Sequence, residues 1–427
     1  MIQIKPSLKL PQIIALYIGA VLGSGILIIP GIAAEISGPA SLIAWGLMII
    51  LVMPMALTMG LLSAKFPNSG GVSYFVTKAF NSHWGSLVGW YFLMSVVIGA
   101  PVLALTGAGY LSTAIGLNDN YRLLIAIVIL LAGLLTNYFG MKVTGQLQIV
   151  VVLVTITILV VTIIGSFSKI DPTNFKPFIS NGWASIGFTL PILFWCFIGW
   201  EAVANISKEF QNPRRDAIRG TIIGAIVVSI IYFFTALVIV GTHSYGLKMS
   251  EASLIYVIKN SFGTYGSIIA GFGALFICIA PAIAYIGAAS RLAFSLAENG
   301  YAPKSFSRTS RKYHTPSGGL LFLAMCFTVL LIVFSSRIIS LAVLIQIPNA
   351  TFILTYLGGC AAGLILLKDS KLGFALSVTS LILSAFVFLF VKWTILYPVC
   401  ITLFWFAFMM LSGRFKITRE FSEKKKP

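Results

Sequence analysis

Residues 19–31 read GAVLGSGILIIPG, an apolar stretch interrupted by glycines, a serine and a proline. In a helix interior, glycine costs roughly 1 kcal/mol relative to alanine and proline about 3 kcal/mol. An apolar segment that carries so many helix-weakening residues at its centre is therefore predicted to unwind there. The question is which kind of protein needs an interrupted apolar helix.

The composition predicts an all-α integral membrane protein. Of the 427 residues, 58% are hydrophobic and only 9% are charged, whereas soluble domains carry roughly 25% charged residues. Crossing the hydrocarbon layer takes roughly 20 apolar residues. We expect twelve such spans: 12–34, 40–64, 86–114, 122–140, 146–168, 184–206, 219–242, 264–290, 318–335, 338–366, 372–390 and 393–412.

The formal charge of +18 would suit a nucleic-acid ligand, but the positions of the charges exclude that interpretation. The loops after even-numbered spans and the two ends of the chain hold 22 of the 29 lysines and arginines. This bias is typical of loops that stay on the cytoplasmic side of a membrane. It predicts a membrane protein with cytoplasmic termini, in contact with lipid and not with nucleic acid.

A second interrupted segment lies five spans after the first. Residues 190–210 read LPILFWCFIGWEAVANISKEF and place Gly199 and Glu201 inside the apolar run. A pair of interrupted spans at corresponding places in two halves is the best sequence pointer to a transporter binding site. We therefore expect a five-plus-five inverted repeat, with halves at 1–169 and 170–369 and two extra helices within 370–427.

Main-chain chemistry explains why such breaks are useful. Each unsatisfied N–H or C=O group in lipid costs several kcal/mol, so a break persists only where it borders a cavity. There, free N–H groups can bind a carboxylate and free C=O groups an ammonium. Two facing breaks therefore suit the head group of an α-amino acid.

Several stretches resemble the amino acid–polyamine–organocation (APC) transporter superfamily. They are GSGILIIPG at 23–31, FPNSGGVSYFVTKAFN at 66–81, FWCFIGWEAVANISKEFQNPRRD at 194–216 and ENGYAP at 298–303. The chain is most similar to the YjeH-type branch, bacterial exporters of methionine and branched-chain amino acids. The resemblance implies the leucine-transporter-like fold, with the substrate held by unwound spans 1 and 6.

The resemblance also implies roles for individual residues. The carboxylate would meet Ser24 and the N–H groups near it, the ammonium would meet carbonyls of span 6, and Trp195 would gate the site. Glu201 matches a position that senses protons in some members. The implied binding residues are Gly23, Ser24, Gly25, Ile26, Ser95, Ile98, Ala100, Leu103, Trp195, Ile198, Gly199 and Tyr285. Asn349, an intramembrane amide beside Pro348, is a further candidate for the lining of the pocket.

Departures from the family pattern narrow the range of substrates that we expect. An amide near Ala100 and an indole near Tyr285, which accompany cationic substrates, are absent. We therefore expect neutral apolar L-amino acids, and the resemblance implies methionine, leucine, isoleucine and valine. Export by proton antiport is the first hypothesis. Import or exchange, with proton symport or another neutral substrate, is the alternative.

Other functions and other roles for these residues remain open at this stage. The glycines near Ser24 could serve helix packing, and Trp195 could be simple core. Asn205 and Ser207 are candidate partners for the Glu201 carboxyl.

Two other classes of membrane protein are alternatives to a transporter. A membrane-embedded enzyme would need clustered acids or histidines, and a channel would need a repeated filter; the sequence favours neither. We expect no metal, no cofactor, and a monomer or homodimer.

Overall fold

The computed structural model describes residues 6–117, 119–246, 253–339, 341–389 and 393–412, and these form helices joined by short connections. The α-helices are α1 (Leu10–Val21), α2 (Gly25–Ser37), α3 (Ser41–Lys65), α4 (Gly71–Ala79), α5 (Ser82–Ala114), α6 (Asp119–Phe139), α7 (Met141–Phe167), α8 (Trp183–Phe194), α9 (Trp200–Ala204), α10 (Pro213–Gly241), α11 (Ser253–Phe262), α12 (Gly266–Glu298), α13 (Ser317–Ser335), α14 (Leu341–Gln346), α15 (Asn349–Leu366), α16 (Lys371–Phe388) and α17 (Leu396–Leu411). The short 3-10 turns are η1 (Gly38–Ala40), η2 (Pro172–Phe175), η3 (Trp195–Phe197), η4 (Ser207–Glu209), η6 (Gly263–Tyr265), η7 (Lys304–Ser307) and η8 (Trp393–Ile395).

The long helices confirm an all-α membrane protein. Within the described residues, 11 helical segments are long and apolar enough to cross a bilayer. One of them runs through η1 from Gly25 to Lys65 and is 41 residues long, about twice the length that one crossing requires. The expected number of twelve spans and the inverted repeat stay predictions.

The interruption expected in residues 12–34 is present. Helix α1 ends at Val21, α2 begins at Gly25, and Leu22 between them has extended backbone angles. Pro30 lies inside α2 without ending it. The unwinding therefore occurs at the Gly-Ser-Gly triplet and not at the proline.

The second expected interruption is also present, and a third was missed. In residues 184–206, α8 passes into η3, and α9 begins only at Trp200. The span expected as continuous over 338–366 is instead two helices, α14 and α15, which meet at Ile347 and Pro348. Proline has no N–H to donate and disfavours helical angles in the residue before it, which accounts for this break.

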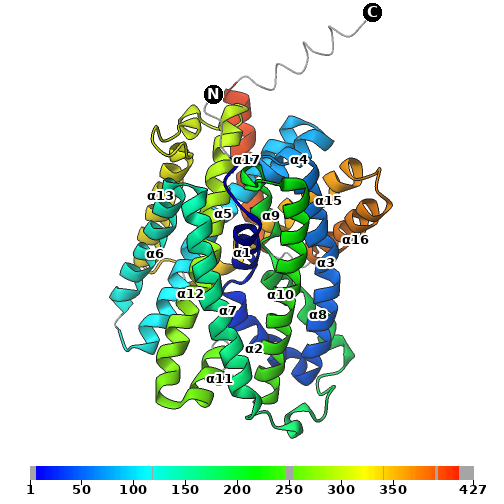
Figure 1. The fold of residues 1–427 in the computed structure, drawn as a ribbon, viewed down its shortest axis with the longest axis vertical. Helices are drawn as coiled ribbons and strands as arrows, with labels where there is room; N and C mark the ends of the chain where they lie inside the picture. The colour runs from blue at the N-terminus through cyan, green and yellow to red at the C-terminus, as the bar shows by residue number, and fades with distance from the viewer. Residues whose placement is uncertain (1–5, 118, 247–252, 340, 390–392, 413–427) are drawn as a thin grey trace, which may run out of the picture.

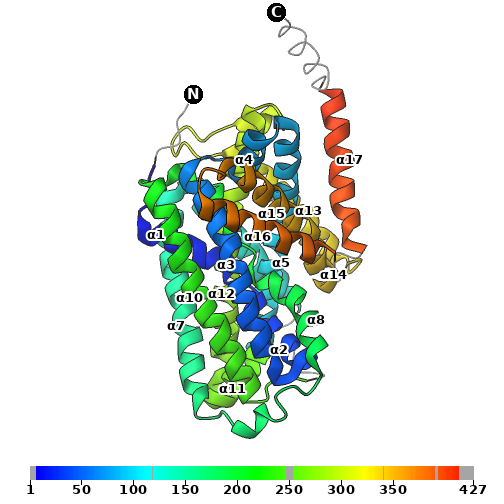
Figure 2. The same ribbon diagram turned by 90° about the vertical axis from the view of Figure 1, so that its right-hand side faces the viewer.

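Helices α5 and α12 form the centre of the bundle and pack on each other along their length. The most apolar stretch of α5 is 78% buried, whereas the corresponding stretches of α6, α13 and the η8–α17 segment are 28% buried. Helix α1 lies in the middle of the molecule, against α10, α7 and α12 (Figure 1). Helix α17 stands at one side (Figure 2). The interrupted helices are thus held among the most buried elements.

The N-terminal segment is tied to the chain that follows α9. Leu8 and Phe210 form a parallel β-bridge, in which the N–H groups of Ser7 and Leu8 donate to the carbonyl oxygen of Glu209. The Glu209 side chain is buried and accepts a hydrogen bond from Nε of Arg291, the donor nitrogen lying 2.5 Å from Oε1. Burial raises the pKa of the Glu209 carboxyl, and the Arg291 charge opposes that rise. This ion pair joins the end of α9 to α12.

Candidate functional site

The break between α1 and α2 leaves main-chain donors free. The N–H of Ile26 donates to the carbonyl oxygen of Gly23 at 3.2 Å, and that of Leu27 donates to Ser24 at 3.1 Å. The N–H groups of Ser24 and Gly25 have no hydrogen-bond partner within the described part of the chain. Helix N-termini with free N–H groups are favourable places for anions.

The break between η3 and α9 has two of its donors occupied, the N–H groups of Gly199 and Trp200. Gly199 adopts φ 144°, a left-handed-region angle that favours glycine. Its N–H donates to Oε2 of Glu201 at 3.0 Å and to the Tyr356 hydroxyl at 3.1 Å. The N–H of Trp200 also donates to the Tyr356 hydroxyl, at 3.1 Å. No hydrogen bond from another described residue reaches the carbonyl oxygens of Trp195 and Ile198. This break therefore offers acceptors.

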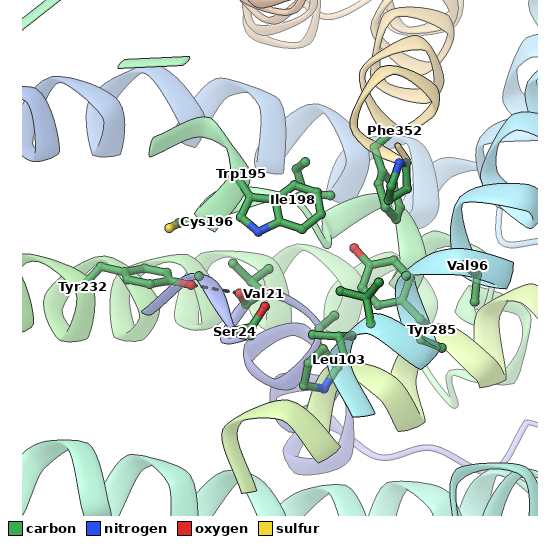
Figure 3. A pocket seen from close by; sticks show the side chains of 18 residues that line it. Val21, Ser24, Val96, Leu103, Trp195, Cys196, Ile198, Tyr232, Tyr285 and Phe352 are labelled. Carbon is green, nitrogen blue, oxygen red and sulfur yellow. Dashed lines mark hydrogen bonds between the residues drawn. The ribbon is translucent and has the colours of Figure 1, made fainter. Parts of the chain in front are cut away.

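A cavity of about 60 Å³ lies between the two breaks (Figure 3). It has room for roughly four water molecules at about 15 Å³ each. Its wall comes from α1, α2, α5, η3, α10, α12 and α15, together with residues at the two breaks and Pro348. The lining residues are Ala20, Val21, Gly23, Ser24, Gly25, Val96, Gly99, Ala100, Val102, Leu103, Trp195, Cys196, Ile198, Tyr232, Pro281, Tyr285, Pro348 and Phe352.

The structure brings eight of the expected site residues to this cavity. Ser24 is 6% exposed, and its hydroxyl lies toward the cavity in Figure 3. The indole of Trp195 lies at the opposite wall, with its ring centroid 6.4 Å from that of Phe352. The eight residues are Gly23, Ser24, Gly25, Ala100, Leu103, Trp195, Ile198 and Tyr285.

The other expected binding residues lie off the cavity wall. The Ser95 hydroxyl hydrogen-bonds to that of Thr351, 2.5 Å away. Ile98 packs in a small apolar cluster with Val102 and Leu344. Asn349 begins α15 but does not line the cavity, although its neighbour Pro348 does. Ile26 and Gly199 also lie outside the wall, and Gly199 acts instead by shaping the break.

Glu201 lies behind the cavity wall, fully buried. Its Oε1 accepts a hydrogen bond from the Tyr285 hydroxyl at 3.0 Å, and its Oε2 accepts one from the Tyr356 hydroxyl. Because Tyr285 also lines the cavity, one phenol connects the site to this carboxyl.

The expected side-chain partners of Glu201, Asn205 and Ser207, were wrong. Asn205 donates to the main-chain oxygen of Glu201 at 3.2 Å, and Ser207 donates to that of Ala204 at 2.8 Å. Asn205 directly follows α9 and Ser207 begins η4, and from these positions both side chains reach main-chain carbonyls. The carboxyl itself points away toward α12 and α15.

Sequence reasoning missed the aromatic residues that complete the site. Tyr232, Phe352 and Tyr356 come from α10 and α15, far along the chain from either break. A tyrosine hydroxyl in the middle of an apolar span needs a hydrogen-bond partner there. This was the feature of the sequence that could have drawn attention to Tyr232 and Tyr356. Nothing in the sequence shows which partner each hydroxyl finds.

Comparisons with known proteins identify the family of the chain. The family model described as amino acid permease matches residues 8–420. The chain belongs to this family, within the APC superfamily. It is 34% identical over 402 residues to YecA, an uncharacterized amino acid permease of Bacillus subtilis, covering 94% of this chain and 95% of that protein.

The names of two further relatives state which amino acids they transport. The L-methionine/branched-chain amino acid exporter YjeH of Escherichia coli is 32% identical over 370 residues, covering 86% of this chain and 87% of that protein. The branched-chain amino acid permease BcaP of Bacillus subtilis is 22% identical over 318 residues, covering 70% and 68%. These relatives are permeases and exporters, so the chain is a transporter and not an enzyme.

Proposed function

We propose that this permease is a secondary active transporter of neutral apolar L-amino acids: methionine, leucine, isoleucine and valine. The observation that carries the proposal is the cavity between two breaks that expose opposite main-chain groups. A zwitterion placed there meets donors on one side and acceptors on the other, in an enclosed apolar setting where such contacts are strong.

The head group is bound by main-chain groups and one hydroxyl. The carboxylate accepts from the N–H groups of Ser24 and Gly25 and from the Ser24 hydroxyl. The N–H of Ile26 is excluded because it already donates to Gly23. The ammonium donates to the carbonyl oxygens of Trp195 and Ile198, which have no other donor among the described residues.

The side chain of the substrate meets an apolar wall. Val96, Ala100, Leu103 and Phe352 border the cavity, and no acidic or amide side chain belongs to its lining. A cationic side chain would lose its hydration there without a compensating partner, at a cost of several kcal/mol. The wall therefore favours methionine and the branched-chain amino acids over arginine.

Transport follows alternating access, in which one group of helices moves against the other around the site. The energy comes from exchange of protons, with Glu201 as the group that gains and loses one and Trp195 as the gate. Export by proton antiport is favoured by the similarity to the E. coli exporter over most of both chains. Import or exchange is the second candidate, favoured by the likeness to permeases.

The distribution of lysine and arginine supports an orientation in the bacterial plasma membrane. Both termini lie in the cytoplasm, and the Leu8–Phe210 bridge lies on that side. The halves 1–169 and 170–369 are inverted repeats, and 370–427 adds two helices to them. The protein functions as a monomer or homodimer.

Counterflow in proteoliposomes tests the proposal. Liposomes preloaded with unlabelled leucine should accumulate labelled leucine, and methionine, isoleucine and valine should compete with it. An imposed pH gradient should drive net flux, whereas a sodium gradient should not. Preference for arginine over every apolar amino acid would overturn the substrate assignment. The direction of proton-coupled flux decides between antiport and symport.

A further inference from the structure

Tyr232 on α10 is the residue that covers the carbonyl end of the first break. Its hydroxyl donates to the carbonyl oxygen of Val21, the last residue of α1, with the two oxygens 3.1 Å apart (Figure 3). Both residues also line the cavity. One of the acceptors that the end of α1 would otherwise expose is thus already occupied.

Two aromatic rings pack against Tyr232, and α10 lies close to α1. The Tyr232 ring stacks on Trp45, with centroids 5.4 Å apart and planes at 21°, and lies 5.2 Å from the ring of Phe197 in η3. A Cβ at Gly220 or Gly224 of α10 would come within 3.1 Å of α1 side chains. These glycines let α10 approach α1 closely, so the phenol reaches the helix end without freedom to turn elsewhere.

We infer that Tyr232 is a positioning residue that sets the orientation of the substrate head group. By occupying the Val21 carbonyl, it leaves the first break with free donors, so the ammonium is directed to the carbonyls of the second break. By contacting Phe197 as well, it holds the two breaks at a fixed separation. This inference rests on the proposed function, since it concerns how that site distinguishes the two ends of a zwitterion.

A fixed separation has a consequence for stereochemistry. Carboxylate, ammonium and side chain then bind at three fixed places, and only one enantiomer can reach all three together. Loss of the Tyr232 hydroxyl removes one anchor of the head-group geometry but leaves the apolar wall unchanged. Discrimination between L- and D-leucine should therefore fall, while discrimination among L-side chains should not.

Counterflow with Tyr232→Phe tests this inference, because the phenylalanine keeps the ring stack on Trp45. We expect the ratio of kcat/KM for L-leucine over D-leucine to fall about fivefold, the effect of one hydrogen bond. The ratio for L-leucine over L-valine should stay at its wild-type value. An unchanged L/D ratio would overturn the inference. Absence of amino acid counterflow in the wild type would instead refute the proposed function.

Two further variants separate positioning from general packing. Tyr17→Phe removes a hydroxyl from an equally buried tyrosine of α1 that does not line the cavity, and it should leave both ratios unchanged. Incorporation of 3-fluorotyrosine at position 232 keeps the ring and the donor, and it should preserve the wild-type L/D ratio even if Tyr232→Phe proves too unstable to assay. A fall of the L/D ratio in either of these variants would contradict the assigned role.

Discussion

The two interrupted spans both turn the chain inside the protein, but they do so with different residues. Between α1 and α2 the chain turns through small residues, and Ser24 has a helical φ of −55°. Between η3 and α9 the turn depends on Gly199, whose φ is 144°. The first break leaves the N–H groups of Ser24 and Gly25 free, whereas at the second two N–H groups are bonded to side chains.

This difference shows how two breaks can differ in the main-chain groups that they leave free. An unwound helix exposes donors and acceptors together, and at each break a neighbouring phenol bonds to some of these main-chain groups. The Tyr232 hydroxyl donates to a carbonyl at the first, and the Tyr356 hydroxyl accepts from N–H groups at the second. This arrangement supports the proposed binding mode, in which the carboxylate meets the first break and the ammonium meets the second.

The largest contrast is expected for alanine at the glycines of the two breaks. A Cβ at Gly199 would lie 2.7 Å from the carbonyl oxygen of Ala20, on a backbone angle that only glycine adopts easily. Strain of about 1–3 kcal/mol, added to this clash, should lower counterflow by about 100-fold and reduce thermal stability.

Gly23→Ala is the matched control, because its Cβ would lie 3.5 Å from Pro281, an ordinary contact. Its melting temperature should therefore stay near that of the wild type. Equal loss of thermal stability in Gly199→Ala and Gly23→Ala would show that the two breaks do not differ in strain.

The next contrast concerns Tyr356→Phe, which removes the acceptor of the buried Trp200 N–H and one of the two acceptors of the Gly199 N–H. Each unsatisfied group costs about 1–3 kcal/mol, so we expect a lower melting temperature and about a tenfold loss of transport. Tyr91→Phe is the control, since its half-buried hydroxyl bonds to Thr402 away from the cavity. If Tyr91→Phe lowered both measurements as much as Tyr356→Phe, the capping role of Tyr356 would be refuted.

Glu201→Gln separates proton exchange from head-group binding at the second break. The amide oxygen can still accept from the Tyr285 hydroxyl, but the side chain no longer exchanges a proton. The rate of leucine counterflow should become independent of pH, while leucine still binds. Glu35→Gln, at an exposed acidic residue, should keep the wild-type pH profile. An unchanged pH profile in Glu201→Gln would remove the proton role.

The smallest effect is expected at the first break for Ser24→Ala, which removes one hydroxyl from the cavity wall. Loss of one hydrogen bond should raise the KM for leucine roughly two- to tenfold and leave kcat nearly unchanged. Ser95→Ala provides the comparison, because that hydroxyl bonds to Thr351 outside the cavity. A larger rise of KM in Ser95→Ala than in Ser24→Ala would place the carboxylate elsewhere.

Residues that weaken a helix were informative in the sequence because their effect is local. The Gly-Ser-Gly triplet predicts the first break and Gly199 marks the second, and the structure has both. Pro348 carries the same kind of signal, but it lay within a span read as continuous. The break before α15 could therefore have been expected from the sequence.

Contacts between distant spans could not be predicted from one sequence. Ser95 was assigned to the site by resemblance and Asn349 as an amide beside Pro348, yet a rotation of one helix decides whether such a side chain meets a cavity or a neighbour. Tyr232 and Tyr356 gave no sign of their partners, which lie more than 150 residues away in the chain. Helix packing in three dimensions, and not local propensity, determines these contacts.

The bridge between Leu8 and Phe210 has a further consequence for how this protein tolerates mutation. Its hydrogen bonds join main-chain atoms of residues 7, 8, 209 and 211, and every amino acid except proline supplies the same donor. The side chains of residues 7, 8 and 211 can therefore change without loss of these main-chain bonds, whereas Glu209 is also held by Arg291 through its side chain. This link depends on the path of the backbone more than on the identity of the residues along it.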